Sequence, residues 1–320
     1  MFVLGIQGSP RKNSNTSILI SEFLEEAKEL NALTCRLEVT SKNIYPCIEC
    51  NVCEEKGFCS INDDMNDIYR LFRKADIVVM GTPIFFYGPT AQLKAIIDRS
   101  QALWTRKHVH NLTDPGRKWR KGFMLAVGAT KGKNLFEGVN LIAKYFFDAI
   151  GADYVGYLGY RRVEAKGAIK DHATALQDVR NKAKELIEPL LSRKRVLFLC
   201  TENACRSQMA AAFARFFAGD KIDVNSAGSR PADEINSIMV EAMEEKGIDM
   251  AHIEPRTIEN AIDGWRPDLV VSMGCGDDCP YIPGVAREEW DFPDPAGRPL
   301  DFMRRVRDGI EDRVKRLLAC

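Results

Sequence analysis

A loop in the second half of the chain has the residue types of a nucleophilic site. Residues 200–207 read CTENACRS and lie between an apolar run typical of a strand and a helix-period run. A loop at such a place directs backbone N–H groups toward a bound tetrahedral oxyanion, and the positive field of the helix N-terminus stabilises a cysteine thiolate. Cys200 could attack the anion, Arg206 could clamp two of its oxygens, and Ser207 could hydrogen-bond the thiolate. The pattern predicts a cysteine nucleophile that acts on an oxyanion.

A second anion-binding loop is predicted near the start of the chain. Residues 8–16, GSPRKNSNT, offer hydroxyls, amides and one guanidinium to a terminal phosphate. The loop has neither the Gly-Lys-Ser/Thr ending of nucleotide-hydrolysing loops nor G-x-G-x-x-G, so FMN fits better than ATP or a dinucleotide. Residues 81–88, GTPIFFYG, end another predicted strand with aromatic side chains that could cover a flat ring. The residues expected to hold FMN are Ser9, Arg11, Asn13, Asn15, Thr16, Pro83, Ile84, Phe85, Phe86 and Gly88.

Four cysteines close together in the first half could hold a metal. They have the spacing Cys-x2-Cys-x2-Cys-x5-Cys in CIECNVCEEKGFC. Four thiolates at close spacing can wrap a [4Fe-4S] cluster, with each thiolate bound to one iron. Zinc also takes four thiolates, but a flavin in the same domain favours a metal that transfers electrons. The expected ligands are Cys47, Cys50, Cys53 and Cys59.

Length, charge and cysteine content limit the classes of function. The 320 residues suit two domains, and 45 basic against 45 acidic side chains give no electrostatic case for nucleic acid or an acidic membrane as the main partner. No apolar run is long enough to span a bilayer and the start lacks the pattern of a signal peptide, so we expect a cytoplasmic protein. Ten cysteines in a reducing compartment are more typical of metal ligands or redox catalysts than of disulfides.

The elements that must position these loops alternate between apolar strands and amphipathic helices. The first half contains the strand-like runs FVLGIQG, CRLEV, ADIVVMGTP, GFMLAVGA and DYVGYLGY, and the pattern begins again at RVLFLC. The alternation predicts two doubly wound parallel-sheet α/β domains, residues 1–190 with five strands in a flavodoxin-like order and residues 195–320 with about four strands. Both anion loops then lie at carboxyl ends of strands. The segment from Trp104 to Trp119 is interpreted as a loop insertion.

Residues 194–320 resemble the low-molecular-weight tyrosine phosphatases and the arsenate reductases built on the same fold. Besides CTENACRS, the resemblance rests on NSAGSRPA, MEEKGID, PDLVVSMGCGDDCP and EEWDFPDPAG. It implies a four-stranded domain in which Asp294, which precedes Pro295, is the general acid that protonates the leaving oxygen. Asp291 is the nearest competitor, but only Asp294 precedes a proline.

The other cysteines of this region decide between ester hydrolysis and arsenate reduction. Reduction needs two electrons, which a second thiol supplies by attacking the sulfur of a thiol–arsenate adduct, leaving a disulfide and arsenite. The resemblance implies that Cys275 is the resolving cysteine and that Cys279 accepts the disulfide, although their Cys-x3-Cys spacing is shorter than the best-known thioredoxin-coupled pattern. Cys205 is an alternative partner for Cys200. DPAG also lacks the aromatic residue that typically follows Asp-Pro in phosphatases acting on tyrosine.

Residues 1–190 resemble the NAD(P)H-dependent FMN reductases and, more closely, the iron–sulfur flavoproteins of the flavodoxin-like fold. The phosphate loop and the aromatic loop carry the first resemblance, and the four-cysteine motif carries the second. The resemblance implies FMN, a [4Fe-4S] cluster, NAD(P)H or ferredoxin as electron donor, and a homo-oligomer formed through this domain.

The two halves together predict an arsenate reductase with its own source of electrons. Cys200 would reduce arsenate with the resolving cysteines, and the flavin domain would re-reduce the disulfide between Cys275 and Cys279. Two alternatives stay open. One is a flavin reductase fused to a low-molecular-weight protein-tyrosine phosphatase, and the other is a C-terminal domain that senses arsenate or phosphate without turning it over.

Overall fold

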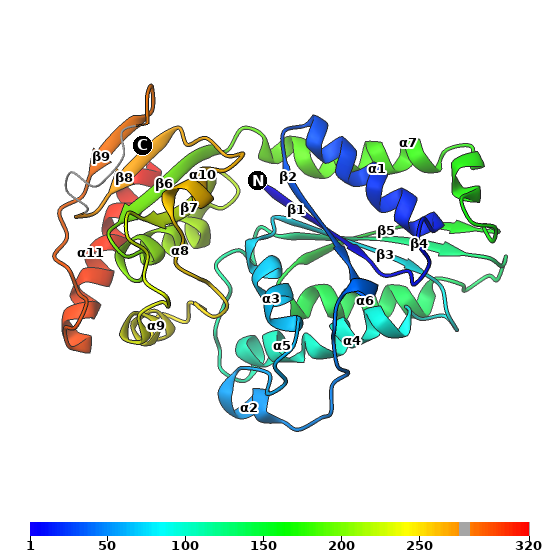
Figure 1. Ribbon diagram of the computed structural model, residues 1–320, viewed down its shortest axis with the longest axis horizontal. Helices are drawn as coiled ribbons and strands as arrows, with labels where there is room; N and C mark the ends of the chain where they lie inside the picture. The colour runs from blue at the N-terminus through cyan, green and yellow to red at the C-terminus, as the bar shows by residue number, and fades with distance from the viewer. Residues whose placement is uncertain (275–281, 320) are drawn as a thin grey trace. The chain divides into compact units, whose positions relative to one another are not determined.

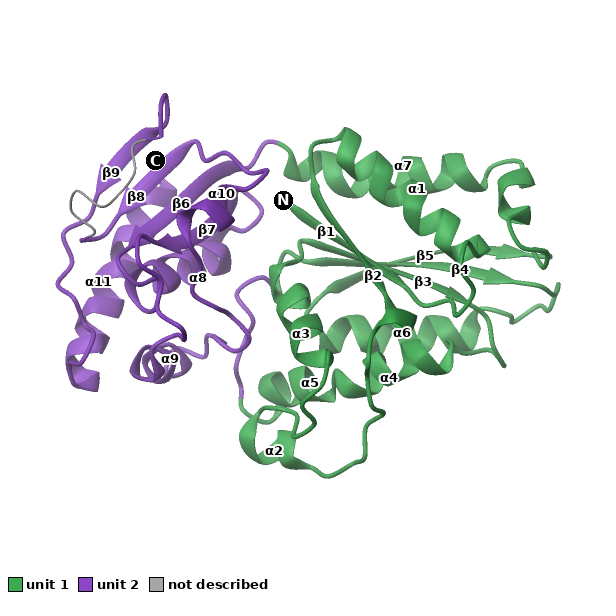
Figure 2. Ribbon diagram, in the orientation of Figure 1, with its two compact units in different colours: residues 1–110, 117–191 green, residues 111–116, 192–320 purple. Residues whose placement is uncertain are grey.

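The computed structural model describes residues 1–274 and 282–319, and its internal contacts divide the chain into two compact units (Figure 2). Unit 1 consists of Met1–His110 and Arg117–Leu191, and unit 2 consists of Asn111–Gly116 and Ser192–Cys320. None of the helices in these described ranges is both long and apolar enough to cross a membrane. Each unit is built around its own parallel sheet, as the alternation of apolar strands and amphipathic helices predicts.

Unit 1 contains a parallel sheet of five strands in the order β2-β1-β3-β4-β5, which is the flavodoxin-like order. The bounds are β1 Phe2–Gln7, β2 Leu33–Glu38, β3 Ile77–Pro83, β4 Lys121–Gly128 and β5 Asp153–Arg161. The central strands β1, β3 and β4 are buried almost throughout, whereas the edge strand β5 has several exposed positions. A strand covered on both faces has no solvent face to mark with polar residues, which explains the continuous apolar runs in the sequence.

Helices cover both faces of this sheet (Figure 1). On one face lie α1 Asn15–Glu29 and α7 Ala175–Ile187, which pack against each other. On the other face lie α3 Met65–Lys74, α4 Ala91–Arg99, α5 Gln101–His108 and α6 Glu137–Ala149. Successive residues of β1 enter different cores: Val3 packs with α1 and α7, and Leu4 packs with α3 to α6. The remaining elements are the short helix α2 Val52–Lys56 and the 3-10 turns η1 Val39–Ser41, η2 Ala168–Asp171 and η3 Glu188–Leu190.

Unit 2 contains a smaller parallel sheet, which has four strands in the order β7-β6-β8-β9 within the described ranges. Its strands are β6 Lys194–Cys200, β7 Ile222–Gly228, β8 Leu269–Ser272 and β9 Ala286–Glu289. Its helices are α8 Arg206–Ala218, α9 Ser237–Glu244, α10 Ile258–Ile262 and α11 Leu300–Ala319. The expected four-stranded domain is confirmed. Strand β9 has the sequence AREE and is mostly exposed, so no apolar run marks it in the sequence.

The segment interpreted as a loop insertion has two parts. Its first residues belong to α5, and residues 111–116 are part of unit 2. There Thr113 forms a parallel bridge with Ile248: the Thr113 N–H donates to Gly247 O at 2.7 Å, and the Asp249 N–H donates to Thr113 O at 2.9 Å. The chain therefore passes from unit 1 to unit 2 and back before its final crossing at Leu191.

Candidate functional site

The loop after Cys200 turns its carbonyl groups away from its own concave side. Four loop carbonyls accept N–H groups from the segment that follows β7: Cys200 O from Ser229 at 3.3 Å, Thr201 O from Arg230 at 2.8 Å, Glu202 O from Ala232 at 2.9 Å and Ala204 O from Asn236 at 3.1 Å. A trans peptide holds the next N–H opposite its carbonyl, so the N–H groups of the loop point the other way. The loop ends at the first residue of α8, where the helix dipole adds positive potential. This arrangement is a cradle for an oxyanion.

The sulfur of Cys200 lies at the base of this cradle and accepts hydrogen bonds. The side chain is 2% exposed, and the N–H of Asn203 donates to its Sγ at 3.2 Å. The hydroxyl of Ser207 lies 3.0 Å from the same Sγ. The Ser207 oxygen accepts the Asn203 amide at 2.7 Å, which leaves its proton free to point at sulfur. Two hydrogen-bond donors can therefore reach this one sulfur.

A buried network holds Asn203 in the conformation that this geometry needs. Asn203 is fully buried with φ 51°, a left-handed conformation that asparagine tolerates better than most residues. Its Oδ1 accepts the N–H of Arg256 at 2.9 Å and the amide of Gln208 at 3.2 Å. Gly228 leaves the room that the loop needs, because a Cβ there would lie 2.6 Å from Thr201 O.

The structure brings together Arg206 and Asp294, the residues expected to be the clamp and the general acid. Arg206 is 5% exposed; its Nη2 lies 3.1 Å from Asp294 Oδ2 and its Nη1 donates to Phe292 O at 3.2 Å. Its buried Nε–H has no hydrogen-bond partner within the described residues, so one donor is left for a ligand. The Asp294 side chain is 55% exposed and therefore open to solvent. Gly274 has φ 69°, a left-handed conformation that favours glycine, and a Cβ there would lie 2.7 Å from Arg206 Nη1.

Of the three cysteines expected as resolving residues, the structure describes Cys205 but not Cys275 and Cys279. Burial, followed by the nearby Cys200 and Asp294, raises the pKa of the Cys205 thiol to about 12. A thiol in that state attacks a sulfur slowly at neutral pH, which argues against Cys205 as the resolving residue. Cys275 and Cys279 lie outside the described residues. Gly274, the last described residue before them, accepts the Thr201 hydroxyl at 3.2 Å and therefore lies beside the Cys200 loop.

In unit 1, the predicted phosphate loop runs from the end of β1 to the start of α1. Ser14 caps the helix: its Oγ accepts the Ser17 N–H at 3.1 Å and also receives the Gln7 amide at 3.1 Å. Gly8 joins the loop to β3 by donating to Gly81 O at 2.8 Å, and a Cβ on Gly8 would lie at that same distance from the carbonyl. The Thr90 hydroxyl donates to Gly8 O at 2.5 Å. A capped helix start with small residues before it fits a phosphate group.

The residues expected to hold the FMN phosphate are placed differently from one another. Ser9 Oγ accepts the Arg11 N–H at 3.3 Å within the loop, and Asn13 has φ 52° at its tip. Thr16 is buried, with its hydroxyl 3.1 Å from Ser14 Oγ. Asn15 is turned toward another segment: its amide donates to Ala165 O at 2.9 Å and its Oδ1 accepts the Ile169 N–H at 3.2 Å. Only the backbone of Asn15 remains available to a phosphate.

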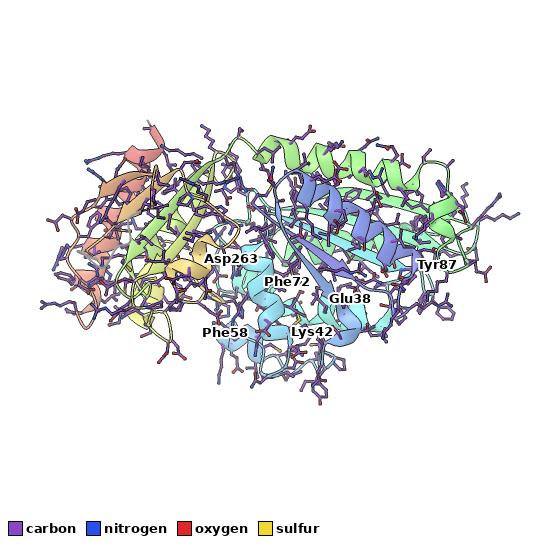
Figure 3. The ribbon with its side chains drawn as sticks, turned by 45° about the horizontal axis from the view of Figure 1, so that its top comes forward. Glu38, Lys42, Phe58, Phe72, Tyr87 and Asp263 are labelled. Atoms are coloured by element: carbon purple, nitrogen blue, oxygen red, sulfur yellow. The ribbon has the colours of Figure 1, made fainter. Side chains whose placement is uncertain are left out.

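The aromatic loop after β3 is a tight turn that displays its rings. Phe85 and Gly88 exchange N–H···O bonds at 3.0 and 2.9 Å, and the two residues between them, Phe86 and Tyr87, have φ 49° and 63°. The side chain of Phe86 is fully exposed and those of Phe85 and Tyr87 are about half exposed; Tyr87 is labelled in Figure 3. Ile84 anchors the turn to β4 through a bond from its N–H to Val127 O at 3.0 Å. Pro83 ends β3 directly before the turn, so the rings lie at the carboxyl edge of the sheet, where a flat cofactor ring can stack.

The four cysteines of the proposed metal motif lie in one segment around α2. Cys47 and Cys50 are exposed, and Cys53 and Cys59 are partly buried against the core. The Ser60 hydroxyl, 3.1 Å from Cys50 Sγ, lowers the pKa of that thiol, whereas burial and the nearby Cys59 raise the pKa of Cys53. Across residues 1–274 and 282–319, no group of three or more His, Cys, Asp or Glu side chains is close enough to hold a metal ion. The donor chemistry of four thiols suits iron, and the thiols would have to converge around it.

Comparison with known proteins relates each half of the chain to a family. The family described as NADPH-dependent FMN reductase matches residues 1–150, and the family described as low molecular weight phosphotyrosine protein phosphatase matches residues 195–320. An iron-sulfur flavoprotein of Methanocaldococcus jannaschii is 32% identical over 194 residues, which cover 59% of this chain and 96% of that protein. Arsenate reductase 1 of Staphylococcus epidermidis is 40% identical over 129 residues, which cover 39% of this chain and 96% of that protein. An arsenate reductase of Bacillus licheniformis is 42% identical over 141 residues, with coverage of 39% and 96%.

The chain belongs to the family of the iron–sulfur flavoproteins through its N-terminal half and to the family of the arsenate reductases through its C-terminal half. The matched family models relate the same two halves to the FMN reductases and to the phosphatase fold. This confirms both resemblances seen in the sequence. The chain is therefore an oxidoreductase that joins two families in one polypeptide.

Several residues that build these two sites were missed by reasoning from the sequence. In the phosphatase-fold domain they are Asn203 and Gln208, and in the flavoprotein domain they are Gln7 and Thr90. Their partners lie between 3 and 82 positions away in the chain. The one available signal was Asn203, since an asparagine inside a Cys-x5-Arg loop suggests a left-handed backbone position.

Proposed function

We propose that this chain is an arsenate reductase in which an N-terminal flavin domain, residues 1–190, supplies electrons to a reductase domain, residues 195–320. The observation that supports it most strongly is the Cys200 site, where two donors aim at the sulfur inside a cradle of N–H groups. Beside this site, Arg206 Nη2 lies 3.1 Å from Asp294 Oδ2. These are the groups that arsenate needs in order to be bound, attacked and protonated.

The first chemical step joins arsenate to the enzyme. Arsenate would enter the cradle and take the Arg206 guanidinium from Asp294, because the dianion offers that cation more charge than a single carboxylate does. The Cys200 thiolate would attack arsenic, forming an S–As bond. Asp294, released from Arg206 and open to solvent, would protonate the departing oxygen so that it leaves as water.

The second step reduces arsenic. A second thiolate would attack Cys200 Sγ, so that the S–As electron pair remains on arsenic and arsenite leaves. We assign this role to Cys275, which directly follows Gly274 beside the loop, and assign to Cys279 the acceptance of the disulfide. Two electrons have then passed from two thiols to arsenic, and a disulfide remains to be reduced.

The flavin domain would provide the electrons for that disulfide. Ser9, Ser14, Thr16 and the first N–H groups of α1 would hold the FMN phosphate, and the rings of the Phe85–Gly88 turn would cover the flavin. Bound FMN accepts a hydride or electrons from a small donor and passes electrons on. The donor would be NAD(P)H or ferredoxin, and Cys47, Cys50, Cys53 and Cys59 would hold a [4Fe-4S] cluster in the same domain.

We also propose that copies of the chain associate through the flavin domain. The exposed aromatic turn lies against the start of α6, since a Cβ on Gly138 would lie 2.6 Å from Tyr87 O. Leu141 and Tyr145 on the same helix are 57% and 66% exposed. Such a row of exposed apolar side chains suits contact with a second copy, and light scattering should show a species of at least twice the mass of one chain.

The coupling is tested with anaerobic protein, reduced by NAD(P)H or by reduced ferredoxin. We expect arsenite to form from arsenate without thioredoxin. A Cys200→Ser variant should lose about 10⁴-fold or more of this activity while its flavin is still reduced. Formation of arsenite only after thioredoxin is added would contradict the flavin domain as the electron source, and arsenite from Cys200→Ser would contradict the nucleophile.

A second candidate is phosphate ester hydrolysis, which the cradle, Cys200 and Asp294 would serve equally well. It needs water in place of the second thiol. Hydrolysis of an aryl phosphate at a rate comparable to arsenate reduction would favour it. We expect this hydrolysis to be much slower, because Ala296 stands after Asp-Pro where a tyrosine-binding phosphatase presents an aromatic ring.

A further inference from the structure

A single buried guanidinium holds both ends of the cysteine segment. Arg99, the last residue of α4, is 1% exposed and binds Asp63 through both terminal nitrogens, at 2.7 and 3.1 Å. Its Nη1 also donates to Tyr45 O at 2.8 Å, and its Nη2 donates to Ile61 O at 3.1 Å. Tyr45 lies two positions before the first cysteine of the motif, and Ile61 lies two positions after the last.

The carboxylate partner reinforces this closure. Asp63 Oδ2 accepts the Tyr45 N–H at 2.9 Å, and Asp63 Oδ1 accepts the Met65 N–H at 3.0 Å. Although burial opposes it, the Arg99 guanidinium lowers the pKa of Asp63, so the pair is ionised at neutral pH. The Arg99 side chain is 0% exposed and the Asp63 side chain is 1% exposed. A buried bidentate pair of this kind holds the cysteine segment more rigidly than an ion pair in water would.

One donor of Arg99 is left over. All its terminal N–H groups have acceptors, but the buried Nε–H finds no hydrogen-bond partner in the described part of the chain. A buried donor without an acceptor costs free energy, so it marks a place where another group is expected. Ile61, whose carbonyl oxygen accepts from Arg99 Nη2, lies two positions after Cys59, so the guanidinium is bonded to the backbone close to the last cysteine of the motif.

A second buried guanidinium supports the middle of the segment. Arg106 on α5 is 3% exposed, lies 4.7 Å from the ring centre of Phe58, and approaches Gly57 O at 3.4 Å. Gly57 has φ 71°, and a Cβ there would lie 2.7 Å from the Arg106 Nη1. Phe58, labelled in Figure 3, directly precedes Cys59. The α4–α5 region thus fixes the backbone before the first, before the last and after the last cysteine.

We propose that Arg99 is the positioning residue of the four-cysteine site: its terminal nitrogens close the segment so that the thiols can converge, and its Nε–H donates to a sulfur of the bound metal site. This inference rests on the proposed iron site in the flavin domain. Lysine cannot replace Arg99, because one ammonium cannot span the two chain ends and the carboxylate in a fixed plane. Loss of an N–H···S bond would also lower the reduction potential of a cluster, since such bonds stabilise its reduced form.

The test compares Arg99→Lys with Arg120→Lys. Arg120 is a matched control in the same unit: it is also 1% exposed and donates to the backbone carbonyls of Arg73, Ala75, Ile150 and Gly151, away from the cysteine segment. Each anaerobic apoprotein is titrated with Co²⁺, whose thiolate absorption reports convergence of the cysteines, and is then reconstituted with iron and sulfide. Cys53→Ser serves as a variant with a damaged ligand set, and circular dichroism follows folding.

We expect Arg99→Lys to bind Co²⁺ on the order of 10- to 100-fold more weakly than the wild type and to yield a cluster of lower midpoint potential. Arg120→Lys should match the wild type in Co²⁺ affinity and in midpoint potential, even if its melting temperature falls as much as that of Arg99→Lys. Equal Co²⁺ affinity and equal potential in the two variants would overturn the proposal. If Arg99→Lys does not fold, Asp63→Asn takes its place, because this variant keeps the shape of the pair. Asp63→Asn should also bind Co²⁺ more weakly than the wild type. An unchanged Co²⁺ affinity of Asp63→Asn would overturn the proposal.

A wild-type protein that binds neither Co²⁺ nor an iron–sulfur cluster would overturn both the role of Arg99 and the iron site. Arsenite formation by the C-terminal domain with added thioredoxin is measured on the same sample. The arsenate reductase assignment is therefore tested separately from the cysteine site.

Discussion

The loops after β1 and β6 share one local plan, a buried strand that leads through a polar loop into a helix, yet they are held differently. After β6, four carbonyls are bonded outward and Asn203, Ser207 and Gln208 form a buried network aimed at one sulfur. After β1, residues 10–13 are exposed, and the fixed contacts are at the ends of the loop, at Gly8 and Ser14. An anion that must react needs donors fixed before it arrives, whereas an anchoring phosphate needs only to be bound.

The largest effect after loss of the nucleophile is expected at the acid of the reacting site. Asp294→Asn should reduce arsenite formation by about 10²- to 10⁴-fold, because the departing oxygen loses its proton donor. Steady-state assays with thioredoxin as reductant measure this. Asp291→Asn is the control and should stay near the wild-type rate; a larger loss in Asp291→Asn than in Asp294→Asn would exchange their roles.

The rigid support of the β6 loop should matter next. Asn203→Gly keeps the left-handed backbone but removes the side-chain bonds to Ser207, Gln208 and Arg256, so the donors to sulfur lose their alignment. We expect kcat for arsenate to fall by roughly 10- to 100-fold. Asn225→Ala removes an amide that bonds Ala261 O at 2.8 Å in the same domain and should change kcat little. Equal effects in the two variants would mean that the network only stabilises the fold.

Removal of a supporting side chain from the β1 loop should weaken the binding of FMN and leave arsenite formation by unit 2 unchanged. Ser14→Ala removes the α1 cap, which is worth about 1 kcal/mol, so the dissociation constant of FMN should rise about fivefold. Fluorescence titration with FMN measures it, and arsenite formation with thioredoxin should be unchanged. Asn236→Ala removes the cap of α9 in unit 2 and should leave FMN affinity at the wild-type value.

The smallest effect is expected at the second cysteine of the reacting loop. With its pKa raised to about 12, the Cys205 thiol is protonated at neutral pH and contributes little as a nucleophile. Cys205→Ala should therefore keep arsenite formation within roughly twofold of the wild type.

In a Cys275→Ser variant, in contrast, the reaction should stop after one S–As adduct has formed per chain, and mass spectrometry should detect this adduct. A tenfold loss in Cys205→Ala would make Cys205 the resolving residue.

Much of the architecture could be predicted because its signals are local. Apolar runs of strand length separated by amphipathic helices specify doubly wound sheets, and the two orders around β1 and β6 follow from right-handed crossovers. Strand β9 was not predicted at its position, because its sequence AREE has neither an apolar run nor a buried face. Asn15 was expected to face a phosphate, but its side chain bonds to residues 165 and 169, about 150 positions away. No local pattern reports where such a partner will lie.

The sequence by itself determined the groups that we propose to react or to bind metal, and their order: Cys200, Arg206 and Ser207 in one loop, Asp294 before a proline, and four closely spaced cysteines. These are covalent facts, and strand–loop–helix geometry is short-ranged enough to follow from them. Only the tertiary structure decided which groups support the reacting ones. Arg206 meets Asp294, Asn203 meets Arg256, and Arg99 closes the cysteine segment through Asp63, because packing of distant elements brings together buried donors and acceptors that have no water to bond instead.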